Sequence, residues 1–245
     1  MIKCCYENIL ETSVVTLSAG TEDAGFPLYR LYDRGIVRFF KTTAAVTTTV
    51  KVDQGGSPIR VDRLLIPAGH NLDGMTLGIE YSDDGISYTP AVAMWVQEGT
   101  ALIEKSWPAE SRRYWRFTIS GPSSAPRITE LFLTRSYEWE KDPAHLSGPL
   151  EPFFNAERDE TSSGQGRHLI NGSAKRQRLY HVSGAWEVQK NNILGLNAAW
   201  AGSKPFFLCD HEGVWMFGEL RKPINLKETA YQEYGFDFDF LEVIP

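Results

Sequence analysis

Residues 50–88 read VKVDQGGSPIRVDRLLIPAGHNLDGMTLGIEYSDDGISY, and this stretch decides the fold. Together with the three residues before it, this stretch contains apolar or alternating runs over residues 47–53, 61–67 and 77–82, with turns rich in Gly and Pro between them. Asp83-Asp84-Gly85 supplies the positive φ that a tight hairpin needs. The run carries no obvious catalytic group. It therefore predicts a β-sandwich that binds or assembles.

The same pattern continues outward from this stretch. Residues 14–18 form a short β-like run, and residues 113–120 (RYWRFTIS) and 127–134 (RITELFLT) predict two later strands. In RYWRFTIS the alternation places Trp115 and Phe117 on one face, as expected for a strand with one buried side. Because no long amphipathic helix separates these strands, the pattern favours an all-β, antiparallel sandwich.

Composition excludes several classes of protein. The chain of 245 residues has 25 Lys and Arg against 31 Asp and Glu, a net charge of −6 without a basic block, which argues against nucleic-acid binding. No run approaches the roughly 20 apolar residues of a membrane helix, and the first residues do not resemble a signal peptide. Three cysteines, with Cys4 and Cys5 adjacent, indicate buried thiols in a reducing compartment.

The second half of the chain predicts another β domain. Residues 138–152 hold three prolines and read as a linker between a domain at 1–137 and one at 153–245. The polar stretch 155–172 predicts a long loop or hairpin tip, and residues 190–201 predict the one helix. Residues 234–243 (YGFDFDFLEV) alternate strictly, which places Asp237 and Asp239 on a solvated face.

Four phrases together resemble a discoidin-like domain, the galactose-binding-like class that includes coagulation-factor 5/8 type C and family 32 carbohydrate-binding modules. They are TTTVKVDQGGSPIRVDRLLI, IEYSDDGISYTP, RRYWRFTISG and ITELFLT, in an order and spacing similar to the family's over residues 10–137. The resemblance implies a jelly-roll β-sandwich. It also implies sugar binding by an aromatic platform and polar loops at one end of the sandwich.

By loop position, the resemblance implies a ligand site at Phe39, His70, Asn71 and Trp107. The chain departs from the family in having Phe39-Phe40 where a tryptophan is common. The family often holds a calcium ion, and the matching positions are Asp33 and Glu130. Calcium takes about six to eight oxygen ligands, so two carboxylates alone do not make a site. No other cofactor is expected.

A second resemblance links the phrases FPLYRLYDRG and GHNLDG to minor or distal tail proteins of long-tailed bacteriophages, and the second half to their tail-tube-like β domains. It implies a structural virion protein of the tail tip or baseplate, assembled in the bacterial host cytoplasm. Its expected partners are copies of itself in a homo-oligomeric ring, other tail proteins (tube, hub and fibres) and a host-surface glycan. The alternative is a stand-alone carbohydrate-binding lectin or adhesin, or an accessory module of a glycoside hydrolase.

Three sequence features suggest an enzyme but have simpler interpretations. Residues 209–212 (CDHE) combine a nucleophile, an acid and a base, yet neighbours on a strand point to opposite faces. Asp237 and Asp239 are the right residue types for a glycosidase carboxylate pair, but a solvated strand face explains them. Residues 164–166 (GQG) lack the spacing of a phosphate loop. We therefore expect no enzymatic activity.

Overall fold

The structure is a computed structural model, which describes residues 2–35, 37–139, 151–153, 156–160, 166–170, 175–185, 187–201, 204–210, 212–230 and 233–242. The chain forms two compact units. One comprises Cys4–Tyr137, and the other combines the first three residues with Glu138–Ile244. The chain passes between the units at β1 (Lys3–Cys5) and at β12 (Tyr137–Glu138).

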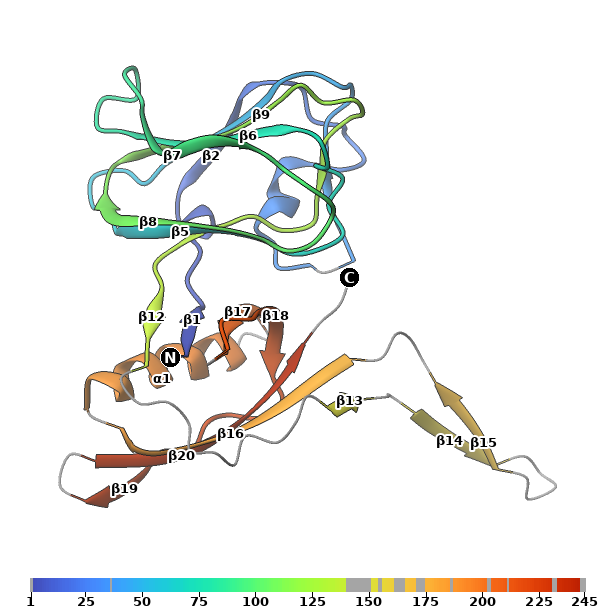
Figure 1. The fold of residues 1–245 in the computed structure, drawn as a ribbon, viewed down its shortest axis with the longest axis vertical. Helices are drawn as coiled ribbons and strands as arrows, with labels where there is room; N and C mark the ends of the chain where they lie inside the picture. Colours follow the sequence, from blue (N-terminus) through green and yellow to red (C-terminus); the bar gives the residue numbers. More distant parts are fainter. Residues whose placement is uncertain are drawn as a thin grey trace. The chain divides into compact units, whose positions relative to one another are not determined.

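The first unit is an antiparallel β-sandwich, as the sequence predicts. Its larger sheet has five strands in the order β2 (Val14–Ala19), β4 (Thr48–Asp53), β9 (Tyr114–Ser120), β6 (Thr76–Ser82) and β7 (Thr89–Val96). The smaller has the order β11 (Phe132–Thr134), β5 (Arg60–Ile66) and β8 (Ile103–Ser111). Figure 1 shows the two sheets as facing layers. Two short 3-10 helices, η1 (Ile9–Glu11) and η2 (Leu28–Leu31), lie on the connections.

Alternating strands fill the space between the two sheets. Strand β9 buries every second residue, namely Trp115, Phe117 and Ile119, and exposes its other side chains partly. Strand β8 likewise buries Trp107, which packs in the same core as Trp115. Both tryptophans therefore contribute to folding through burial of large apolar surfaces.

The hairpin after β6 forms as the sequence predicts. Gly85 adopts a φ of 72°, a left-handed conformation that glycine adopts without steric cost. The side chain of Asp84 accepts hydrogen bonds from the backbone N–H groups of Ile86 and Ser87, each at 2.8 Å. These bonds favour the charged carboxylate and lower the pKa of Asp84 to about 2.

A third, two-stranded sheet positions the candidate site. Strand β3 (Phe40–Lys41) pairs antiparallel with β10 (Arg127–Ile128), so that Phe40 lies opposite Ile128 and Lys41 opposite Arg127. Phe40 and Ile128 are fully buried. Because side chains alternate along a strand, Lys41 and Arg127 both point away from the core.

The second unit is also mainly β. Its larger sheet has the order β12, β1, β17 (Phe206–Cys209), β18 (Trp215–Leu220), β20 (Glu233–Glu242), β16 (Lys175–Ala185) and β13 (Glu151–Phe153), and β19 (Lys227–Ala230) also pairs with β20. Strands β14 (Ala156–Glu160) and β15 (Gly166–Ile170) form a separate hairpin, within the stretch predicted as a loop or hairpin tip. Helix α1 (Glu187–Ala201) begins three residues before the predicted start.

The structure differs at Asp239 from what the sequence predicts for the second unit. Asp239 is 8% exposed, so the prediction that it lies on a solvated face is wrong. The side chain of Asp237 lies outside the described residues.

Strand β13 begins inside the predicted linker. Residues 140–150 of that linker also lie outside the described residues. In the CDHE stretch, Asp210 is buried and accepts hydrogen bonds from the backbone N–H groups of Glu212 and Val214, as in a turn. His211 lies outside the described residues.

The three cysteines have the state that the sequence predicts. Cys4, Cys5 and Cys209 are buried thiols. Over the residues that the structure describes, no helix combines the length and hydrophobicity that a membrane crossing requires.

Candidate ligand-binding site

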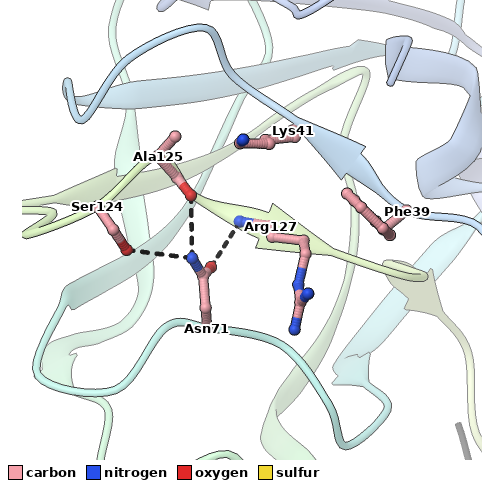
Figure 2. Close-up of a pocket in the computed structure, with 6 residues that line it drawn as sticks. All are labelled: Phe39, Lys41, Asn71, Ser124, Ala125 and Arg127. Atoms are coloured by element: carbon pink, nitrogen blue, oxygen red, sulfur yellow. Dashed lines mark hydrogen bonds between the residues drawn. The ribbon is translucent and has the colours of Figure 1, made fainter. Parts of the chain in front are cut away.

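A pocket of about 420 Å³ lies beside the two-stranded sheet of β3 and β10 in the first unit. Its lining comes from β3 and the residue before it, from the loop after β5, and from β10 and the loop that leads into it. The lining residues are Phe39, Lys41, Asn71, Ser124, Ala125 and Arg127. In Figure 2 the side chain of Arg127 extends between Asn71 and Phe39, with Lys41 on the neighbouring strand. Three segments distant in the sequence thus build one site.

Asn71 fixes the two loops to each other. Its side-chain amide donates hydrogen bonds to the carbonyl oxygen of Ala125 at 2.9 Å and to the hydroxyl of Ser124 at 3.2 Å. Its side-chain oxygen accepts a hydrogen bond from the backbone N–H of Arg127 at 2.6 Å. These bonds, drawn in Figure 2, use both ends of the amide. Asn71 therefore holds the pocket wall and offers a ligand little hydrogen-bonding capacity of its own.

Phe39 supplies the aromatic surface of the pocket. Its ring stacks on Phe26 with centroids 4.5 Å apart and an interplanar angle of 12°. The guanidinium carbon of Arg127 lies 5.2 Å from the Phe39 centroid, within the range of a cation–π contact. A ligand in the pocket would therefore meet the ring together with the guanidinium group, instead of an isolated aromatic platform.

Two positive charges dominate the electrostatics of the pocket. Lys41 and Arg127 face the same side of their two-stranded sheet, because they lie directly opposite each other in the register. The guanidinium of Arg127 donates one hydrogen bond, to the carbonyl oxygen of Gly69 at 3.2 Å. Neither side chain has a salt bridge within the described part of the chain.

Two of the residues expected to bind a ligand lie elsewhere. His70 is 1% exposed, and its Nδ1 accepts the backbone N–H of Leu72 at 3.2 Å. Its Nε2 therefore carries the proton and donates to the carbonyl oxygen of Ala101 at 2.8 Å. Burial lowers the pKa of His70, which favours this neutral form. The residue shapes the loop that presents Asn71 and does not face the pocket.

Trp107 is a core residue. Only 8% of it is exposed, its ring centroid lies 5.7 Å from that of Trp115, and its Nε1 donates to the carbonyl oxygen of Val61 at 3.1 Å. The expectation that Trp107 offers a surface for a sugar is therefore wrong. Trp95 packs partly buried against the same core.

The residues expected to hold calcium do not fit a calcium site. One carboxylate oxygen of Glu130 accepts the backbone N–H of Arg34 at 2.9 Å, while Asp33 is exposed and accepts the N–H of Gly35 at 2.8 Å. The other oxygen of Glu130 is buried without a hydrogen-bond partner, which gives one available ligand where calcium takes about six to eight. No cluster of three or more His, Cys, Asp or Glu suited to a metal occurs among the described residues.

Glu130 makes the stability of the first unit depend on pH. Burial raises the pKa of Glu130 well above 4.5, against a smaller opposing effect of the Arg34 charge. At pH values between the unfolded pKa of about 4.5 and the raised folded pKa, the folded state therefore binds more protons than the unfolded state. Its free energy of unfolding therefore falls as pH rises from about 4.5 through the folded pKa.

We expect this fall to be absent in Glu130→Gln, measured by urea denaturation across a pH series. Glu98→Gln, which changes an exposed carboxylate, should retain it. An unchanged pH dependence in Glu130→Gln would show that Glu130 is ionised in the folded state.

Comparison with known proteins gives likenesses only among solved structures. No protein-family model and no curated protein matches the chain. Chitosan-binding module 1 from a chitosanase/glucanase of Paenibacillus sp. IK-5 is 19% identical, with a TM-score of 0.44, over 54% of this chain and 99% of that one. The CBM32 of AlyQ, in complex with 4,5-unsaturated mannuronic acid, is 24% identical, with a TM-score of 0.41, over 54% and 98%.

A third similar structure is the GH29 fucosidase of Ruminococcus gnavus in complex with fucose. It is 17% identical, with a TM-score of 0.45, over 54% of this chain, but the chain spans only 27% of that enzyme. None of these three is a phage tail protein. The tail-protein resemblance stays a prediction.

The structure thus brings together two of the four expected ligand residues, Phe39 and Asn71, and adds two cations that the sequence reasoning missed. One signal for the missed residues was available. If Phe40 is buried, strand alternation places Phe39 and Lys41 on the same outer face. The position of Arg127 beside them depends on the pairing of β3 with β10, which no local pattern indicates.

Proposed function

We propose that the first unit is a non-catalytic module that binds a saccharide in the pocket at Phe39. The observation that supports this most is the pocket itself, which combines an aromatic ring, a hydroxyl and two cationic donors. Asn71 joins two of its loops, and the pairing of β3 with β10 holds the third segment. Sugars present apolar ring faces and many hydroxyl oxygens. Phe39 offers contact to the former, and Lys41 and Arg127 offer donors to the latter.

The lining chemistry favours binding over catalysis. None of the six lining residues is a carboxylic acid, a histidine or a cysteine. The pocket therefore lacks the paired acid and base that glycoside hydrolysis requires. Saccharide binding agrees with the discoidin-like sequence phrases, and it does not depend on the predicted tail-tip role or on a homo-oligomeric ring, both of which stay predictions.

Replacing Phe39 by alanine tests the proposal. Affinity gel electrophoresis against a panel of soluble polysaccharides should show retardation of the wild-type chain, and Phe39→Ala should weaken the strongest interaction about tenfold or more, because it removes an aromatic contact at the centre of the site. Met94→Ala, which truncates an exposed apolar side chain on β7, is the matched control and should bind as the wild type does.

Two results would count against a saccharide site at this pocket. One is the absence of retardation by every polysaccharide in the panel. The other is retardation that Phe39→Ala leaves unchanged, because binding would then occur at another surface.

A further inference from the structure

We propose that the pocket selects anionic saccharides, those that carry a carboxylate or sulfate group, and that Lys41 and Arg127 bind this group. The inference rests on the proposed saccharide-binding function and goes beyond it by naming the chemical class of the ligand. It is based on the charges in the pocket, their register in the sheet, and a comparison with the other cations of the same unit.

The arrangement of the two cations is unfavourable without an anion. Lys41 and Arg127 lie directly opposite each other on an antiparallel pair, where like charges destabilise the sheet. Lys41 is half-buried, which reduces the solvation of its ammonium group. Since neither cation has a salt bridge within the described residues, an anionic group bound between them would relieve the repulsion.

The large sheet of the same unit contains a similar pair that is neutralised. There Lys51 lies opposite Arg116, which in turn lies opposite Glu80 on the next strand. The guanidinium of Arg116 lies 2.7 Å from the Glu80 carboxylate. The fold thus supplies a carboxylate to an opposed cation pair on the large sheet.

At the pocket the sheet has only two strands. The segment on the other side of β3 places Asp23 beside Lys41, with the backbone N–H of Asp23 donating to the carbonyl oxygen of Lys41 at 3.0 Å. The carboxylate of Asp23 accepts the backbone N–H of Gly25 at 2.9 Å and makes no salt bridge with Lys41.

Two further arginines, in the loop that leads into β9 of the large sheet, are also paired with carboxylates. Arg113 is paired with Asp53 at 2.8 Å, and Arg112 with Asp83 at 2.7 Å. Four other arginines of the unit, like Arg127, have no salt bridge within the described residues, namely Arg30, Arg38, Arg60 and Arg135. Arg127 instead contacts one carbonyl oxygen and one aromatic ring, which leaves further donors of its guanidinium group for a ligand. A planar guanidinium with available donors matches the geometry of a carboxylate or a sulfate.

The same charges predict what the pocket rejects. A polycationic saccharide such as chitosan would bring ammonium groups to a pocket with two cations and no acidic lining residue. A neutral saccharide would bind through Phe39 and hydroxyl contacts, but without neutralising the pair. The order of affinity should therefore be anionic, then neutral, then cationic.

The test compares saccharides that differ only in charge, by isothermal titration calorimetry on the full chain. The pairs are tetragalacturonate and its methyl ester, sialyllactose and its methyl ester, and a heparin tetrasaccharide and its desulfated, N-acetylated and carboxyl-reduced form. We expect the anionic member of at least one pair to bind about tenfold or more tightly than its neutral partner. We also expect this preference to weaken with rising salt, because the charged side chains are partly solvated.

Arg127→Gln and Lys41→Gln should each remove most of the preference. Because both side chains also offer donors to hydroxyl oxygens, each variant should weaken binding of the neutral partner as well, but by a smaller factor than binding of the anionic one. Arg113→Gln is the matched control, because it changes the net charge equally but lies outside the pocket. Thermal unfolding of each variant checks the fold, and relief of the like-charge pair predicts no loss of stability in Lys41→Gln. If Arg127→Gln does not fold, Arg127→Lys keeps the charge and tests the guanidinium geometry.

The outcomes separate this inference from the proposed function. If neutral partners bind as tightly as anionic ones, with binding that depends on Phe39, the charge selectivity is overturned and the saccharide site stands. If no saccharide binds in a manner that depends on Phe39, both are overturned. A preference for anionic saccharides that Arg113→Gln reduces as much as Arg127→Gln would also overturn the assignment to this pocket.

Discussion

Trp107→Ala should lower the free energy of unfolding of the first unit by about 3–5 kcal/mol, the usual cost of truncating a large core aromatic side chain. The ring packs against Trp115 between the two sheets, and only 8% of the residue is exposed. The substitution also removes the hydrogen bond from Nε1 to the carbonyl oxygen of Val61. Urea denaturation measures the change in free energy, and hydrogen exchange in β5 and β9 assigns it to the first unit.

Trp107→Phe separates the two contributions. It keeps most of the apolar volume and loses the hydrogen bond. Loss of this bond should lower the free energy of unfolding by about 1 kcal/mol, in addition to the effect of the smaller ring. If Trp107→Ala left stability unchanged and abolished saccharide binding, Trp107 would be the surface platform that the family resemblance implies, and its placement in the core would be contradicted.

Gly218→Ala should destabilise the second unit by at least about 3 kcal/mol, at the upper end of overpacking effects. An added Cβ would lie 2.2 Å from the carbonyl oxygen of Leu241 and 2.9 Å from the Cα of Glu242. These are backbone atoms of β20, which pairs directly with β18. Because β18 also pairs with β17 on its other side, it cannot shift away without loss of one of the two ladders.

Hydrogen exchange in β18 and β20 reports this effect directly. Glu219→Ala, at the neighbouring and partly exposed position, serves as the control and should change exchange in these strands little. Unchanged protection in Gly218→Ala would mean that β18 and β20 are not paired in the register described here.

Local sequence patterns predicted much of the fold, because strand alternation and turn chemistry act over a few residues. The buried face of β9 and the Gly85 turn are examples. The sequence also predicts helix α1, in which the apolar Leu194 is 51% exposed. These features need little knowledge of the distant chain.

Trp107 shows where local patterns are insufficient. Its position before Pro108 suggested a surface loop, yet β8 continues through the proline from Ile103 to Ser111. Strand β8 lies at the edge of its three-stranded sheet, where the missing N–H of a proline is tolerated. Trp107 then falls on the inward face of the strand.

The pocket could be predicted only in part for a related reason. Loop position indicated Phe39 and Asn71, but the opposition of Lys41 and Arg127 depends on pairing between residues far apart in the chain. Two cations that face each other without a carboxylate between them become visible only when the pairing of their strands is known. The feature that distinguishes this site from a generic sugar pocket is therefore a tertiary one.

The most direct test of saccharide recognition at this pocket is nuclear magnetic resonance of the ¹⁵N-labelled chain. Tetragalacturonate, sialyllactose and the heparin tetrasaccharide are each titrated into a separate sample. The account predicts that at least one of them shifts the backbone amides of Lys41, Asn71 and Arg127 and the side-chain amide of Asn71, and that its neutral partner shifts them less at equal concentration. Shifts confined to other surfaces of the first unit, or none at all with any of these ligands, would contradict it.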